Sequence, residues 1–133
     1  ALKTLHQFFC EKIKLYFSRL ASNKDENPVV FQIKEYLHQN YAVPSLSVPD
    51  ISEHVRLSPT YVCTLFKNET GQTLNQYLTD YRIKMSKQFL SDPLYKITDI
   101  SAKVGYSDGN YYSKAFRKIV GLSPSEYREK MLR

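Results

Sequence analysis

The chain has 133 residues, 42% of them hydrophobic and 24% charged, which is the composition of a globular protein with one compact domain or two very small ones. No apolar run approaches the roughly 18 residues that a membrane-spanning helix needs, and no secretory signal opens the chain, so we expect a soluble protein without membrane contact. Two cysteines, Cys10 and Cys63, cannot build a disulfide framework and fit a reducing cytoplasm. Because the chain opens on Ala1 rather than Met, we expect a fragment or a processed chain.

The net charge of +6 lies entirely in the C-terminal part of the sequence. Residues 1–81 hold 8 Lys and Arg against 8 Asp and Glu, whereas residues 82–133 hold 11 against 5. A basic region of this kind indicates an anionic partner, with nucleic acid as the first interpretation and a membrane surface as the second. From charge alone, a solvated basic surface without a partner is an equally good interpretation.

The first 28 residues are expected to form a unit of their own. Apolar residues recur in steps of three and four from Leu2 to Leu20, which predicts an amphipathic N-terminal helix. The polar stretch 22–28 ends at Pro28 and predicts a linker. The apolar stripe within residues 2–20 is interpreted as the seam of a homodimer, the tail of a missing regulatory region, or a surface that packs against the rest of the chain.

Helical spacing dominates the remaining sequence, and its capping residues, prolines and glycines set the predicted helix ends. The expected helices span about 29–40, 48–55, 59–70, 74–90, 97–104, 108–120 and 124–133. Ser58, Ser107 and Ser123 are predicted N-caps. Gly71 and Gly121 are predicted to end the helices that begin after the first two of these caps. The predicted fold class is all-α.

The chain contains an internal repeat, in which one sequence pattern occurs twice. SPTYVCTLFKNETG, at 58–71, and SDGNYYSKAFRKIVG, at 107–121, each run from a serine through a phenylalanine and a basic residue to a glycine. Each follows a short predicted helix and a tight turn, which is the helix-turn-helix plan. The predicted helix 74–90 joins the two copies as a rod of roughly 25 Å. A tandem of this kind, with excess positive charge over the second copy, favours DNA binding over an ordinary helical domain.

The two longer helices of the repeat divide into a core face and an exposed face. The residues predicted to face the core are Val62, Leu65 and Phe66 in the first copy and Tyr112, Ala115, Phe116 and Ile119 in the second. Polar and basic residues remain on the outside, and a helix with that surface is suited to the major groove of DNA. Arg56 stands where the second copy has Gly105, and a left-handed backbone there would cost arginine roughly 1 kcal/mol.

Two stretches, DISEHVRLSPTYVCTLFKNETGQTLNQYLTDYRI and ITDISAKVGYSDGNYYSKAFRKIVGLSPSEYR, resemble the two halves of the AraC/XylS-type bacterial transcription regulator domain. The resemblance covers about residues 29–133. It implies seven helices, with a first half at about 29–72, a connecting helix at about 73–91 and a second half at about 92–133.

The same resemblance implies a function in the bacterial cytoplasm, at the nucleoid. The recognition helices, at about 59–70 and 108–120, would read two successive major grooves of double-stranded DNA, and RNA polymerase is the expected protein partner. If the two helices lie closer than one DNA turn, about 34 Å, the duplex must bend. Such a bend costs about 1–6 kcal/mol. A further domain is expected to control when the regulator acts.

The resemblance also assigns candidate site residues. Those that match the family's base-reading positions are Thr60, Cys63, Thr64, Gly109, Asn110 and Lys114. The short side chains of the first three suit thymine methyl groups and single hydrogen bonds, whereas Asn110 can grip adenine and Lys114 can reach guanine. Cys63 is interpreted as a small spacer rather than a redox group. The candidate phosphate contacts are Ser58, Tyr61, Lys67, Ser107, Tyr111, Arg117, Lys118 and Ser123. Tyr111 can instead cover the edge of the core, and Arg82 is interpreted as structural.

The alternative function from another class is a helical adaptor that binds proteins, which the N-terminal apolar stripe favours. An enzyme is not expected, because no nucleophile–base spacing, phosphate-binding glycine loop or acidic pair stands out. The three histidines are scattered and none pairs with a cysteine at metal-ligand spacing, so neither a metal nor another cofactor is expected.

Overall fold

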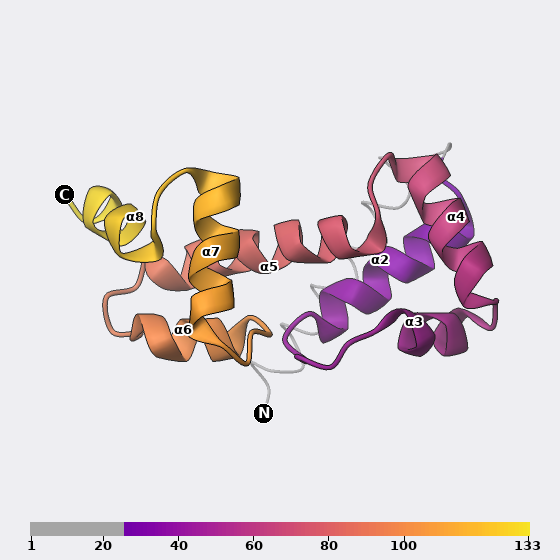
Figure 1. Cartoon of the computed structure of the whole chain (residues 1–133), viewed down its shortest axis with the longest axis horizontal. Coiled ribbons are helices and arrows are strands. Elements are labelled where there is room, and N and C mark those ends of the chain that lie inside the picture. Colours follow the sequence, from indigo (N-terminus) through magenta and orange to yellow (C-terminus); the bar gives the residue numbers. More distant parts are fainter. Residues whose placement is uncertain (1–25) are drawn as a thin grey trace, which may run out of the picture.

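The computed structural model describes residues 26–133, and all regular structure in that range is helical. The helices are α2 (Pro28–Asn40), α3 (Val48–Val55), α4 (Pro59–Thr70), α5 (Leu74–Leu90), α6 (Ile97–Lys103), α7 (Gly109–Val120) and α8 (Pro124–Met131). Figure 1 shows α2, α3 and α4 gathered at one end of α5, and α6, α7 and α8 at its other end. The all-α prediction, with two helix-turn-helix units on one long helix, is confirmed. The helix predicted within residues 2–21 lies outside the described residues.

Local capping explains where most helices begin and end. Ser58 Oγ accepts a hydrogen bond from the backbone N–H of Tyr61 at 3.2 Å, and Pro59 occupies the first helical position of α4. Ser123 caps α8 in the same way, accepting from the N–H of Glu126 at 3.1 Å. Gly71 ends α4 with a left-handed φ of 78°, a conformation that glycine adopts without steric cost. These sequence-based assignments are confirmed.

The predicted cap of α7 at Ser107 is wrong by one residue. Helix α7 begins at Gly109, and the carboxylate of Asp108 accepts from the N–H of Asn110 at 2.8 Å. The second copy of the repeat carries one residue more than the first between its serine and its phenylalanine. That extra residue moves the cap to Asp108, which lies as far from Phe116 as Ser58 lies from Phe66.

Each end of α5 carries its own hydrophobic core. The first core consists of Val30, Ile33, Leu37, Ile51, Val62, Phe66, Leu74 and Leu78. The second consists of Ile83, Leu90, Ile100, Val104, Tyr112 and Phe116. We call the part around the first core the first head and the part around the second core the second head. Because α5 contributes apolar residues to both cores, it is the element that both heads share.

Small residues allow the short and long helices of each head to cross closely. Ser52 and Ser101 are both buried, at 8% and 5% exposure. A Cβ atom placed on Gly109 would lie 3.8 Å from Ser101 Oγ, so the start of α7 passes close to α6. The small side chain of Ser101 therefore permits this close approach.

The predicted core face of α7 is wrong at its last turn. Tyr112 and Phe116 are fully buried and Ala115 packs against the second core, but Ile119 is 44% exposed. Val120 packs against that core instead. The helical stripe drifts around the helix axis, and at the last turn it no longer faces the core.

Arg56 adopts the left-handed conformation that its alignment with Gly105 indicates. It ends α3 with φ 58° and ψ 42°, and it is the only described residue other than glycine with positive φ. The backbone N–H of Arg56 donates to the carbonyl oxygen of Glu53 at 3.3 Å, and this bond holds the turn in place. The turn therefore forms in spite of the steric penalty of a side chain at this position.

Candidate nucleic-acid interface

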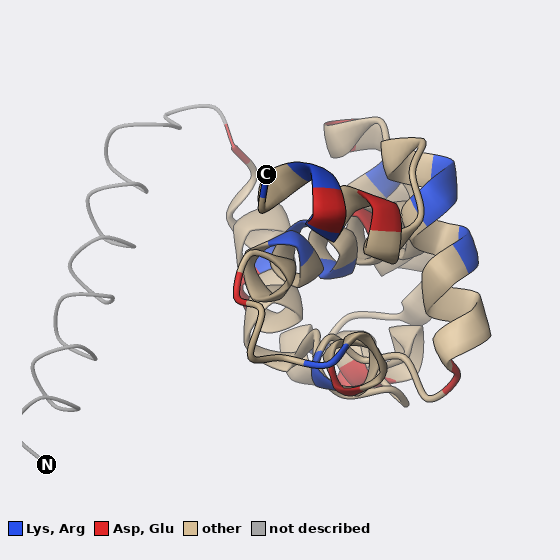
Figure 2. Cartoon of the chain, turned by 90° about the vertical axis from the view of Figure 1, so that its left-hand side faces the viewer, with Lys and Arg blue, Asp and Glu red and all other residues tan. Residues whose placement is uncertain are grey.

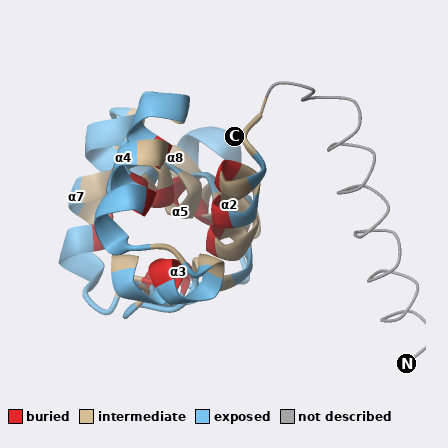
Figure 3. Ribbon diagram, turned by 90° about the vertical axis from the view of Figure 1, so that its right-hand side faces the viewer, coloured by how far each residue is buried: buried red, intermediate tan, exposed pale blue. Residues whose placement is uncertain are grey.

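Helices α4 and α7 are presented in the same way. Figure 1 shows both running from the lower to the upper edge of the molecule, with α7 passing in front of α5. In the view turned by 90°, α4 and α7 lie on the same side of α5, and α2 lies on the other side (Figure 3). Exposed residues cover the outer faces of both helices, so one side of the molecule offers two helical surfaces to a partner.

The outer face of α4 holds the candidate residues of the first head. Thr60, Cys63 and Thr64 are all exposed, whereas Val62 and Phe66 on the opposite face are fully buried. The exposed side chains are short and uncharged, so they can approach a base edge closely. They offer methyl groups and single hydrogen bonds rather than a forked grip.

Two longer side chains accompany that face. Tyr61 is 52% exposed at the first turn of α4. The ammonium of Lys67 donates to the carbonyl oxygen of Gly71 at 3.0 Å, so it covers the C-terminal end of α4 while it remains exposed. A cation at this end of a helix also interacts favourably with the helix dipole.

The outer face of α7 is more strongly basic. Gly109, Asn110 and Lys114 are exposed along it, and Arg117 and Lys118 follow at its C-terminal end. Figure 2 shows basic segments on the upper turns of α7, at the right of the view. The N-cap of this helix is the acidic Asp108. Helix α7 therefore has an acidic N-cap, uncharged exposed residues in its first turn and a cationic C-terminal end.

For Tyr111 and Ser107, two of the predicted phosphate candidates, the structure decides between the roles that were expected. Tyr111 is 70% exposed, so it does not cover the core. Ser107 is exposed but leaves capping to Asp108, whose carboxylate occupies the N–H of Asn110. A carboxylate at this helix start repels an approaching phosphate, so the start of α7 is a poorer anion site than that of α4.

Equivalent positions in the two heads differ by fifty residues, as the buried pair Phe66 and Phe116 shows. On this register Thr64 corresponds to Lys114, and Cys63 corresponds to Ser113. Ser113, half-buried on α7, is therefore a candidate that the sequence analysis left out. The sequence contains a clue to this position, because the second copy has one extra residue between its serine and its phenylalanine. An alignment of the two copies on their serines is therefore one residue out of register at Ser113.

A groove runs along α5 between the two candidate surfaces. It is lined by Lys67, Gly71, Gln72, Asn75, Gln76, Thr79, Asp80, Lys118 and Ile119. The C-terminal ends of α4 and α7 thus border one open channel, with Lys67 of α4 on one side and Lys118 of α7 on the other. The exposed Ile119 lies in this channel, which the helical periodicity of α7 alone did not predict.

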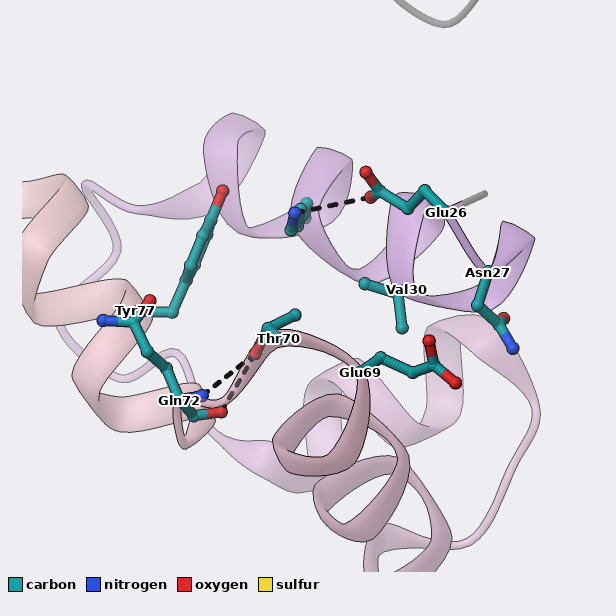
Figure 4. Close-up of a pocket in the computed structure, with 8 residues that line it drawn as sticks. Glu26, Asn27, Val30, Glu69, Thr70, Gln72 and Tyr77 are labelled. Atoms are coloured by element: carbon teal, nitrogen blue, oxygen red, sulfur yellow. Dashed lines mark hydrogen bonds and ion pairs between the residues drawn. The ribbon is translucent and has the colours of Figure 1, made fainter. Parts of the chain in front are cut away.

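A second pocket lies between the start of α2 and the turn from α4 to α5 (Figure 4). Glu26, Glu69 and Tyr77 are among its lining residues. The carboxylate of Glu26 pairs with the ammonium of Lys34 at 3.5 Å. Because two carboxylates line it, this pocket is unsuited to the phosphates of DNA.

Arg82, in the middle of α5, is a structural residue, as expected. Its two hydrogen bonds do not involve Asp80, which lies two residues before it on the same helix. Its guanidinium donates to the carbonyl oxygens of Tyr41 at 2.8 Å and of Val43 at 2.9 Å. Burial lowers the pKa of Arg82, while the neighbouring Tyr106 opposes that shift. The Asp80 carboxylate instead accepts a hydrogen bond from Gln72 at 2.9 Å.

The described residues also limit other site types. Within residues 26–133, no three or more His, Cys, Asp or Glu side chains are arranged to hold a metal ion. In the same range, no helix combines the length and apolar character needed to cross a bilayer.

The family model of a helix-turn-helix domain matches residues 51–130, which is more than half of the chain. The chain belongs to the AraC/XylS-type family of helix-turn-helix domains. The solved structure of the C-terminal domain of AraT, a response regulator from Geobacillus stearothermophilus, is similar with a TM-score of 0.77 and 28% identity. That similarity covers 80% of this chain and 88% of the AraT domain.

Two further comparisons extend this assignment. The Msm operon regulatory protein of Streptococcus mutans is 36% identical over 110 residues, which are 83% of this chain and 39% of that relative. The DNA-binding domain of AdpA, solved in complex with a target DNA, has the same fold, with a TM-score of 0.70, 19% identity and coverage of 79% of this chain and 93% of that one. The chain thus spans less than half the length of that curated relative.

The AraC/XylS-type domain found here is a DNA-binding domain of transcription regulators. The relatives described above are regulators, and nothing in their names points to catalysis. The family assignment expected from the sequence is confirmed.

Proposed function

We propose that the chain is the DNA-binding part of a transcription regulator and that α4 and α7 enter two successive major grooves on one face of the duplex. The observation that carries this proposal is the common presentation of α4 and α7 on one side of α5 (Figure 3). A dimeric helix-turn-helix protein needs two chains to present such a pair, about one DNA turn apart. This chain supplies both helices itself.

In this proposal, base reading falls to the exposed side chains near the starts of the two helices. Thr60, Cys63 and Thr64 read one half-site, and Gly109, Asn110 and Lys114 read the other. Asn110 and Lys114 offer the stronger discrimination, because an amide can grip adenine and an ammonium can reach both acceptors of guanine. The second head therefore carries more of the sequence preference than the first.

Phosphate contacts hold the duplex in register without reading it. The residues proposed for this role are Ser58, Tyr61, Lys67, Ser107, Tyr111, Arg117, Lys118 and Ser123. The groove along α5 supports the assignment of Lys67 and Lys118, because these two lysines flank the channel between the recognition helices. We propose that the strand crossing between the two major grooves passes over this channel. The amides of Asn75 and Gln76, which line it, then become additional phosphate contacts.

We propose that α5, whose 17 residues span roughly 25 Å, holds the two recognition helices at about that separation. This is shorter than one DNA turn of about 34 Å, so we propose that the duplex bends toward the protein. Bending costs about 1–6 kcal/mol, and the additional phosphate contacts offset that cost.

The wider setting of the chain is also a proposal. Regulators with this type of domain act on transcription, so we propose a bacterial, nucleoid-associated location, contact with RNA polymerase and control by a further domain. The proposed homodimer through residues 2–20 concerns a segment outside the described residues. Sedimentation of the chain with and without residues 1–22 tests it, since an unchanged mass per complex contradicts a dimer seam there.

Selection of bound duplexes from a random pool, followed by footprinting, tests the central proposal. We expect enrichment of one sequence with two protected major-groove segments one turn apart, and an affinity that falls steeply with salt. An adaptor that binds only proteins would enrich no sequence and would show no steep dependence on salt. Protection of a single groove would contradict the two-helix proposal.

A further inference from the structure

The two heads meet at one residue of α5. Leu78 belongs to the first core and Ile83 to the second, so the boundary between the cores falls within the helical turn that contains Arg82. A helix alone fixes the distance between two bodies, but each body can still rock about its own attachment. Contacts at this boundary therefore decide how rigidly the heads are oriented.

The Arg82 guanidinium reaches the first head by two hydrogen bonds. Its Nε donates to the carbonyl oxygen of Tyr41 at 2.8 Å, and an η nitrogen donates to the carbonyl oxygen of Val43 at 2.9 Å. Both carbonyls belong to the loop between α2 and α3, some forty residues away in sequence. The planar fork of arginine makes such a two-point contact directional, which a single ammonium cannot match.

The same guanidinium faces the second head. Its Cζ lies 5.6 Å from the ring centre of Tyr106, in the turn between α6 and α7. The Tyr106 ring lies 5.7 Å from that of Tyr112, a fully buried residue of α7. Arg82 is therefore linked through two aromatic rings to the second recognition helix.

Gly105 allows the two heads to come this close. A Cβ atom at this position would lie 2.7 Å from Arg82 Nε and closer still to the carbonyl oxygen of Tyr41. Tyr41 itself packs against both hydrophobic cores. Tyr41 from the first head, Arg82 from α5 and Gly105 from the second head thus form one contact, which we call the head junction.

We propose that the head junction locks the orientation of the two recognition helices and that Arg82 is a positioning residue for DNA recognition. Arg82 touches no base in this proposal. It sets the spacing and the angle at which α4 and α7 meet the duplex, and so it determines which half-site spacing the chain accepts. The DNA part of this inference rests on the proposed function, while the locked orientation does not.

Pre-organisation gives the expected consequence. When two binding surfaces are held at the correct separation, the second binds within a complex already formed, and affinity falls when the target spacing no longer matches. Insertion of one base pair between the half-sites shifts the second by about 3.4 Å and rotates it by about 35°. A locked protein cannot follow that change, whereas an unlocked protein can.

The test compares Arg82→Met and Arg82→Lys with Lys84→Met, which removes one cation from an exposed position of the same helix. Amide residual dipolar couplings, measured by NMR without DNA, report the orientation of the heads. We expect the wild type and Lys84→Met to fit a single alignment frame, and both Arg82 variants to require a separate frame for each head. A single frame for both Arg82 variants would overturn the lock.

The second measurement uses the selected duplex and versions with one base pair inserted or removed between the half-sites. We expect the wild type and Lys84→Met to lose about tenfold or more in affinity on the altered spacings, and the Arg82 variants to lose less than about threefold. An undiminished spacing penalty in both Arg82 variants would overturn their role in positioning. If the wild type selects only a single half-site, the proposed function fails, and the couplings still decide the lock.

Discussion

Gly71 and Gly105 share a left-handed backbone but differ in what surrounds it. Their φ angles are +78° and +97°, yet a Cβ atom at Gly71 would meet nothing within 4 Å, whereas one at Gly105 would collide with Tyr41 and Arg82. The first glycine is required only by its local conformation. The second is required both by its conformation and by the contact between the heads.

This difference predicts unequal effects of the same substitution. Gly71→Ala is expected to lower the free energy of unfolding by about 1 kcal/mol, the cost of a Cβ atom in the left-handed region. Gly105→Ala adds the strain of an overfilled contact, about 1–3 kcal/mol more. Urea unfolding of the two variants measures this, and equal losses would contradict the packing assigned to Gly105.

Arg56 offers the opposite test, because here a side chain already occupies the left-handed conformation. Arg56→Gly removes a steric cost of about 1–2 kcal/mol. Glycine also raises the conformational entropy of the unfolded chain, which lowers the free energy of unfolding by about 0.4–1 kcal/mol. We therefore expect a net stabilisation between zero and about 1.6 kcal/mol in thermal or urea unfolding. Arg56→Ala is the control, since it removes the charge but keeps the Cβ atom, and a gain of the same size in Arg56→Ala would assign the effect to charge.

Lys114 and Arg117 lie on the same exposed face of α7 but are given different roles. Lys114→Ala is expected to relax the preference at one base pair, at a loss of about 1–3 kcal/mol on the selected site and little on a scrambled one. Arg117→Ala is expected to weaken binding to both sites alike and to reduce the salt slope by about one. Competition binding at several salt concentrations separates these outcomes. Equal weakening of both sites by Lys114→Ala would remove Lys114 from the base-reading set.

His38 makes the stability of the first head sensitive to acid. Its Nε2 lies 2.7 Å from the hydroxyl of Tyr77, and its ring stacks on Tyr81 at 4.2 Å. Burial lowers the pKa of His38, and Lys34 and Lys84 lower it further. Burial raises the pKa of Tyr77 to about 12, so this phenol stays protonated and can donate to the neutral ring.

The sign of the effect follows from linkage. Because the folded-state pKa of His38 lies below its unfolded value of 6.5, the unfolded chain takes up the proton more readily. The stabilisation from the neutral ring is fully present above about pH 6.5 and is lost as the pH falls through the folded pKa. Melting temperatures from pH 8 down to about pH 5 should therefore decline less steeply in His38→Gln than in the wild type. A decline in His38→Gln as steep as that of the wild type would contradict this role of His38.

The sequence by itself determined the elements that depend on nearby residues. The N-caps at Ser58 and Ser123 and the helix end at Gly71 were predictable, because a cap and a left-handed turn involve groups only a few residues apart. The buried face of α4 followed from helical periodicity, and so did that of α7 as far as Phe116. The family resemblance added the pairing of two helix-turn-helix units on one helix, and with it the exposed candidate residues.

Only the tertiary structure decided what depends on contacts between elements. Ile119 is exposed because at the last turn of α7 Val120, and not Ile119, packs against the second core, and only the folded arrangement shows which of the two faces it. The partners of Arg82 are carbonyl oxygens some forty residues away. Because every residue carries a backbone carbonyl, the sequence does not indicate which carbonyls Arg82 will contact. Helix ends are fixed by short-range hydrogen bonds and can be read along the chain. The orientation of the two heads depends on long-range packing, and it emerges only when the chain is folded.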